Sequence, residues 1–166
     1  MRCWWAGSIS ASRLRVFVYG TLKRGEINHD RYCRGVVGIE PATTLGHLYA
    51  LPYGFPGLCV DETRIKATGT SDYLADTELQ YDAQLISAAT LAMHLDTVYG
   101  ELLTFDDPET SLPEIDALEG YTPGENSFYW RTLYPVETSG KHVLAWLYHI
   151  PRPTGEYLPG GRWPIS

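Results

Sequence analysis

Residues 14–25 have the sequence LRVFVYGTLKRG, a short apolar run followed by a loop with a glycine at each end. The run from Leu14 to Tyr19 becomes apolar at consecutive positions, as expected for a strand that is covered on both faces. The glycines after it, Gly20 and Gly25, mark a loop. The stretch therefore predicts a buried strand that carries the segment Tyr19-Gly20-Thr21-Leu22 out of the core.

Further strand and helix signals follow along the chain. Many short strands with little helix favour an α+β fold, either a small mixed β-barrel or a strongly curved sheet with flanking short helices. They disfavour a parallel doubly wound fold. The expected strands are 36–49, broken by Pro41 and Gly46, then 58–61, 97–105, and a hairpin of 128–136 with 143–150 that turns at Ser139-Gly140; the expected helices begin near Asn28 and span 76–92 and 112–119.

A chain of 166 residues has the usual length of one domain. We expect that domain to cover residues 14–150, after a flexible tail at 1–13 and before an extended segment at 151–166. Trp4 and Trp5 could instead anchor the tail to the domain. Residues 62–94 are polar and rich in alanine, so they are interpreted as an excursion from the main fold.

Composition limits the possible partners. The formal net charge is −7, with 44% hydrophobic and 20% charged residues, so the sequence predicts a globular protein that binds neither nucleic acid nor an anionic membrane. Its three cysteines show no CxxC spacing, which argues against disulfides and a zinc site and favours a cytoplasmic location. Residues 1–13 contain no apolar run long enough for a signal peptide or membrane span. A monomer is the favoured oligomeric state.

The helix at 112–119 has well-marked ends. Ser111 and Glu114 have the spacing of a capping box, Pro113 suits a first turn, and Gly120 is a natural stop. At about 3.6 residues per turn, Leu112, Ile115 and Leu118 share one face. Glu119 projects into that apolar stripe.

A carboxylate in an apolar stripe needs a reason, because burying its charge is costly unless the charge is paired. Partial desolvation would raise its pKa from about 4.3 toward values useful in general acid/base catalysis. Alternatively, Glu119 ends a frayed helix and turns to solvent, or it pairs with Arg131. Arg131 itself could reach Glu119 or be a solvated strand residue.

The loop at Tyr19-Gly20-Thr21-Leu22 could direct backbone N–H groups toward a carboxylate or an oxyanion. The alternative is a tight turn with no ligand. A nucleotide site is rejected, because Glu26 stands where a phosphate-binding loop requires lysine. The sequence predicts no metal site, since the five histidines lie on separate segments, and it predicts that the cysteines are small buried thiols.

Several sequence blocks occur in a fixed order along the chain. They are VFVYGTLKRG at 16–25 with Asn28-His29, GHLY at 46–49, FPGL at 55–58, VYGELL at 98–103, IDALEGY at 115–121, Tyr129 with Arg131, and AWLY at 145–148. Together these blocks resemble the γ-glutamylcyclotransferase-like family. The resemblance covers most of residues 16–150, and its main departure is the excursion at 62–94.

The resemblance implies a small mixed barrel with a side pocket and an enzyme that acts on a small-molecule γ-glutamyl substrate. In the family reaction, the α-amine of the substrate attacks its own γ-glutamyl carbonyl, which releases 5-oxoproline and an amine without metal or cofactor. Glu119 would be the catalytic proton shuttle, Tyr19, Gly20, Thr21 and Leu22 would bind substrate, and Tyr129 and Tyr148 would form walls. The alternative is a noncatalytic module on the same fold that binds a small molecule or a protein.

Overall fold

The computed structural model describes residues 12–83 and 94–164, with β1 (Leu14–Val18) at the centre of the sheet. β1 pairs antiparallel with β5 (Asp96–Phe105) on one side and parallel with β7 (Lys141–His149) on the other. Both faces of β1 are covered, because Leu14 and Val16 belong to one buried cluster and Phe17 to another. The predicted buried strand is thus confirmed.

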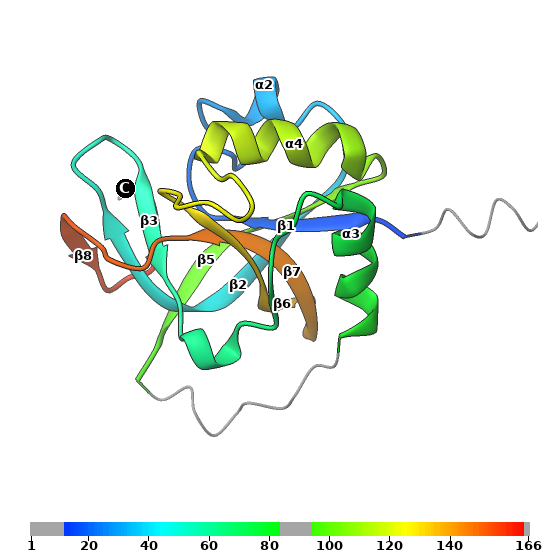
Figure 1. Cartoon of the computed structure of the whole chain (residues 1–166). Helices are drawn as coiled ribbons and strands as arrows, with labels where there is room; N and C mark the ends of the chain where they lie inside the picture. The colour runs from blue at the N-terminus through cyan, green and yellow to red at the C-terminus, as the bar shows by residue number, and fades with distance from the viewer. Residues whose placement is uncertain (1–11, 84–93, 165–166) are drawn as a thin grey trace, which may run out of the picture.

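The strands form one mixed sheet in the order β3-β2-β5-β1-β7-β6-β4, and β8 pairs with β2 outside this path. The sheet is strongly curved, since β2 also pairs with β6 through Thr43 and Glu137 (Figure 1). This curved sheet with short helices confirms the predicted α+β class. The remaining strands are β2 (Val36–Ala50), β3 (Pro56–Cys59), β4 (Ala67–Thr68), β6 (Trp130–Thr138) and β8 (Glu156–Leu158).

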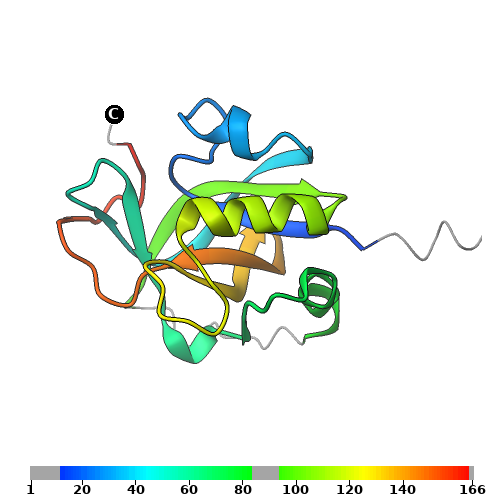
Figure 2. The same cartoon turned by 45° about the horizontal axis from the view of Figure 1, so that its top comes forward.

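Helices flank the sheet (Figures 1 and 2). They are α2 (His29–Tyr32), α3 (Tyr73–Asp82), α4 (Pro108–Glu119) and a 3-10 turn at Glu62–Arg64. Leu112 and Ile115 of α4 enter the same buried cluster as Leu14 of β1, so α4 covers one face of the sheet. Within the described ranges, no helix is both long and apolar enough to cross a membrane.

The start of α4 corrects the prediction from the sequence. The helix begins at Pro108, one turn before Leu112, and the backbone N–H of Ser111 donates to the Asp107 carbonyl at 3.0 Å. Proline suits this first position because it has no N–H to leave unpaired. Ser111 is consequently buried inside the helix, and the capping box was wrong. The predicted stop is confirmed, with Gly120 in the left-handed conformation at a φ of 69°.

Two other boundaries also differ from expectation. β2 runs without interruption through Pro41 and Gly46, although a break was expected at both. Gly46 is accommodated because it sits against the neighbouring strand, where a Cβ would lie 2.5 Å from the Cys59 carbonyl oxygen. The segment after Ile150 is more than extended chain, because its residues 156–158 form β8 and pair with β2.

The hairpin prediction is confirmed, with β6 and β7 joined by Ser139-Gly140 at φ values of 51° and 74°. The helix expected at 76–92 is α3, which spans Tyr73–Asp82; residues 84–93 lie outside the described residues, as do Trp4 and Trp5. The described part of the excursion is tied to the sheet, because the Trp146 indole N–H donates to the Asp76 carbonyl at 3.0 Å.

Candidate active site

A cavity of about 360 Å³ opens beside the end of β1. It is formed by the end of β1 and the loop after it, the end of the β2–β3 connection with the first residue of β3, the end of α4 and the residues just before β6, with one contribution from β7. The cavity brings together every predicted site residue. Its described lining residues are Phe17, Val18, Tyr19, Gly20, Thr21, Leu22, Asn28, Phe55, Pro56, Leu118, Glu119, Gly120, Phe128, Tyr129 and Tyr148.

The loop after β1 offers consecutive backbone donors to this cavity. Within residues 12–83 and 94–164, the N–H groups of Gly20, Thr21 and Leu22 have no hydrogen-bond acceptor. The loop is nevertheless fixed, because the Asn28 N–H donates to the Thr21 carbonyl at 3.0 Å and the Asn28 amide donates to the Thr21 hydroxyl at 2.9 Å. Unpaired N–H groups on an ordered loop are suited to an anion.

Gly20 is required for the shape of this loop. A Cβ on Gly20 would lie 2.7 Å from Cγ of Pro56, which is closer than two carbon atoms can approach. Pro56 is also held from the other side, because its carbonyl accepts the hydroxyl of Tyr129. The absence of a side chain at Gly20 therefore lets the β2–β3 connection close one side of the cavity.

Glu119 is the last residue of α4, and Gly120 ends the helix directly after it. The carboxylate lines the cavity, and no hydrogen bond to it is found among the described residues. Burial, together with the negative charge of Asp116, raises the pKa of Glu119 to about 8. Arg131 donates to other groups, so the predicted alternative of a Glu119–Arg131 pair was wrong.

The tyrosines of the cavity use their hydroxyls to hold the walls. Tyr19 donates to the Tyr148 carbonyl at 2.6 Å and accepts from the Leu58 N–H at 3.2 Å. Tyr148 in turn donates to Asp116. Burial raises the pKa of Tyr19 and of Tyr148 well above the ordinary value for tyrosine. Both phenols therefore stay neutral near pH 7, and their positions are fixed.

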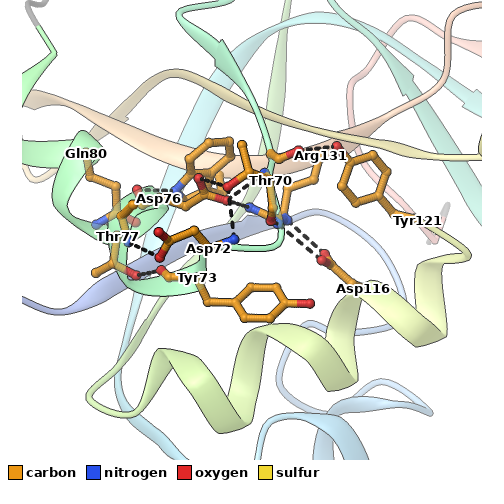
Figure 3. A network of polar contacts seen from close by, with 12 residues as sticks. Thr70, Asp72, Tyr73, Asp76, Thr77, Gln80, Asp116, Tyr121 and Arg131 are labelled. Atoms are coloured by element: carbon orange, nitrogen blue, oxygen red, sulfur yellow. Dashed lines mark hydrogen bonds and ion pairs between the residues drawn. The ribbon is translucent and has the colours of Figure 1, made fainter. Parts of the chain in front are cut away.

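Behind the cavity, Arg131 on β6 joins α3 to α4 (Figure 3). Its Nε donates to Asp116 Oδ1 at 2.8 Å and its Nη1 to Asp76 Oδ2 at 3.0 Å. The side chain is 0% exposed, so the alternative of a solvated strand arginine was wrong. Its fit is close, since a Cβ on Gly69 would lie 2.5 Å from the Arg131 guanidinium carbon. Arg131 thus links the excursion to the helix that carries Glu119.

Asp116 is the part of the site that sequence reasoning missed. It is 3% exposed, and it accepts hydrogen bonds from Arg131 and from Tyr148, which lines the cavity. Burial raises the pKa of Asp116, while the adjacent Arg131 guanidinium opposes that rise. Asp116 therefore contacts the cavity wall and also contributes negative charge near Glu119.

In the part of the chain that the structure describes, the other titratable side chains provide neither a metal site nor an activated thiol. Among residues 12–83 and 94–164, no group of three or more His, Cys, Asp or Glu side chains could hold a metal ion. Burial raises the pKa of Cys33 to about 12 and of Cys59 to about 11, which makes both poor nucleophiles at neutral pH. His29 is buried, with Nδ1 2.8 Å from the Leu22 carbonyl, and so supports the donor loop from behind.

The family model described as gamma-glutamyl cyclotransferase, AIG2-like, matches residues 16–85 and 81–164. The chain belongs to this family. The resemblance inferred from the sequence blocks is thus confirmed. No protein of curated function matches the chain.

Solved structures with the same type of fold include YkqA from Bacillus subtilis, with a TM-score of 0.54 and 20% sequence identity. That likeness covers 91% of this chain but only 39% of YkqA, so the chain spans about two-fifths of that protein. An AIG2-like protein from Mus musculus has a TM-score of 0.49 and 20% identity, over 85% of this chain and 80% of that one. An uncharacterized protein from Pyrococcus horikoshii has a TM-score of 0.47 and 19% identity, over 90% and 89%.

Proposed function

We propose that the protein converts a γ-glutamyl amide into 5-oxoproline and a free amine, with Glu119 as general acid and base. The observation that carries this proposal is that the carboxyl group of Glu119, without a hydrogen-bond partner among the described residues, lines the same cavity as a loop with three unpaired backbone N–H groups. Burial raises the pKa of this carboxyl, which suits it to proton transfer. Membership of the gamma-glutamyl cyclotransferase, AIG2-like, family supports the same reaction class.

The substrate would be held by its α-carboxylate. The N–H groups of Gly20, Thr21 and Leu22 supply three neutral donors, and no arginine or lysine is found among the described lining residues. Such donors stabilise an anion without adding a competing positive charge beside Glu119. The α-ammonium on the same carbon would then face the carboxylate of Glu119.

The reaction begins when Glu119 accepts a proton from the α-ammonium, which leaves an amine with a free electron pair. That nitrogen attacks the γ-carbonyl carbon, and a five-membered ring forms. Collapse of the tetrahedral intermediate breaks the bond to the leaving nitrogen, to which Glu119 returns the proton. The ring nitrogen still carries a second proton from the original ammonium, and it passes that proton through Glu119 to the released amine, so the products are the neutral lactam and an ammonium ion. No water is consumed. Because both reacting groups belong to one molecule, the cyclisation needs no second reactant, and holding the substrate curled places the amine beside the carbonyl that it attacks.

The raised proton affinity of Glu119 suits both steps. A carboxylate of ordinary pKa takes a proton from an ammonium poorly, whereas one with a pKa of about 8 is a stronger base and still returns the proton as an acid. Asp116 supports this role through its negative charge, the second cause of the shift. The Asp116 carboxylate also accepts the hydroxyl of Tyr148 and so fixes that side chain in the cavity wall.

The proposal is tested by incubating the protein with γ-glutamyl amino acids, γ-glutamylamines and γ-glutamyl-ε-lysine. We expect equimolar 5-oxoproline and amine from at least one of them, measured by mass spectrometry. A hydrolase would release glutamate instead, and a noncatalytic binding module would raise the melting temperature without forming product. Either of those results would contradict the proposal.

The pH dependence of kcat/KM provides a second check. We expect a rising limb centred near pH 8, because Glu119 must be ionised to accept the proton and burial raises its pKa to about 8. Replacing Asp116 with Asn removes a negative charge that raises this pKa, so the limb should move to lower pH. A rate that is constant from about pH 6 to 9 would exclude Glu119 as the titrating base.

A further inference from the structure

One rim of the cavity is a cluster of four aromatic side chains, here named the aromatic wall and composed of Tyr53, Phe55, Phe128 and Tyr129. Phe128 is central, with its ring centroid 5.1 Å from Tyr129, 6.0 Å from Tyr53 and 6.3 Å from Phe55. Each of these three pairs is edge-to-face, at interplanar angles of 73° to 81°. Such pairs are favourable beyond their buried area.

The aromatic wall joins two separate connections. Tyr53 and Phe55 lie between β2 and β3, while Phe128 and Tyr129 lie between α4 and β6. The first connection is closed by a hydrogen bond of 3.0 Å from the Leu51 N–H to the Phe55 carbonyl. Tyr129, just before β6, donates its hydroxyl to the carbonyl of Pro56, the first residue of β3, and so ties the α4–β6 connection to the end of the β2–β3 connection. The wall is therefore ordered before any ligand binds.

Much of this apolar surface remains open to solvent. Tyr53 is 62% exposed and Phe128 is 46% exposed, although both belong to a packed cluster. Three of the four rings, those of Phe55, Phe128 and Tyr129, also line the cavity. An exposed apolar patch that continues into a cavity is a common feature of ligand-binding sites.

The proposed chemistry decides which part of a substrate would lie there. The γ-glutamyl portion carries a carboxylate and an ammonium, whose partners would be the donor loop and Glu119. Aromatic rings offer no N–H donor to a carboxylate. The leaving amine, which is the remaining part of the substrate, would therefore extend along the wall.

We propose that the aromatic wall is a subsite for a leaving amine with an aromatic or other flat apolar substituent. This inference rests on the proposed function, because it takes Glu119 and the donor loop as the γ-glutamyl end. Phe128 is its central contact, since it packs on the other three rings and still exposes nearly half of its surface. A ring bound edge-to-face against it gains both burial and ring pairing.

Binding measured in a Glu119→Gln background tests the subsite without turnover. The probes are the γ-glutamyl amides of benzylamine and of methylamine, which share the γ-glutamyl end and differ only in the ring. By isothermal titration calorimetry, we expect the benzylamide to bind about tenfold more tightly. Adding Phe128→Ala should reduce that preference by about fivefold.

Leu74→Ala in the same background is the matched control. Leu74 lies on α3 outside the cavity lining and is 49% exposed, close to the exposure of Phe128, so the preference should not change. Equal affinity for the two amides, a preference unaffected by Phe128→Ala, or no binding of either amide would overturn the subsite. Failure of the proposed function is recognised separately, as absence of 5-oxoproline when the unmodified protein is given either amide.

Discussion

Replacing Glu119 with Gln should lower kcat by about 10²- to 10⁴-fold, the range typical for loss of a general acid and base. Glutamine keeps the shape of the side chain but cannot take a proton from the α-ammonium. KM should change less than kcat, because the substitution removes the partner of the α-ammonium but leaves the proposed contacts of the Gly20-Thr21-Leu22 backbone to the substrate α-carboxylate. Steady-state release of 5-oxoproline measures both constants.

Glu114→Gln is the control for this substitution. Glu114 lies on the same helix, α4, but is exposed and outside the cavity lining, so kcat should stay unchanged. Equal loss in the two variants would indicate that the helix is damaged and not that a base is removed. Full turnover by Glu119→Gln would contradict the proposed role.

Replacing Arg131 with Met should lower the free energy of unfolding by about 3–5 kcal/mol, as expected when one member of a buried ion pair is removed. Methionine fills much of the same apolar volume, but it leaves Asp116 and Asp76 buried without their cation. Both carboxylates are 3% exposed, so water cannot readily replace the Arg131 guanidinium as their hydrogen-bond donor. Urea unfolding at neutral pH measures the difference.

Two variants distinguish this charge effect from simple loss of packing. Arg152→Met removes an exposed arginine and should change stability by less than about 0.5 kcal/mol. Adding Asp76→Asn and Asp116→Asn to Arg131→Met removes the unpaired charges and should recover part of the lost stability. If the triple variant is less stable than Arg131→Met alone, the network is held together mainly by packing.

The position of Glu119 could be predicted because it follows from local geometry. At about 100° per residue, the seven steps from Leu112 to Glu119 bring the carboxylate within about 20° of the buried leucine. The donor loop could be predicted for a similar reason, since it directly follows a strand that is apolar on both faces. What the sequence could not establish is that the two features share one cavity.

Asp116 was open to the same reasoning. It lies about 40° from Leu112 on the other side, so Asp116 flanks the apolar stripe into which Glu119 projects. The hydrogen bonds that it accepts from Arg131 and Tyr148 depend on how α4 packs against the β6–β7 hairpin, which local sequence patterns do not show. Burial of Arg131 likewise depends on α3, whose poor apolar periodicity suggested an excursion and gave no sign of the Asp76 contact.

The start of α4 was missed because two prolines compete for it. Pro113 and Pro108 both suit a first turn, and the correct choice is set by the Asp107 carbonyl, which accepts from Thr110 at 3.2 Å and from Ser111 at 3.0 Å. The aromatic wall could not be foreseen either. It joins residues more than 70 positions apart, and alternation along each strand says nothing of how two connections meet.

The proposed reaction requires the carboxyl group of Glu119 to be held where its proton affinity is raised. The most direct test is a ¹³C NMR titration of the glutamate side-chain carboxyls, with the Glu119 signal assigned by its loss in Glu119→Gln. We expect a midpoint near pH 8 for this group, against an ordinary value of 4.5. A midpoint near 4.5 would mean that Glu119 is solvated, and it would contradict the proposed proton transfer.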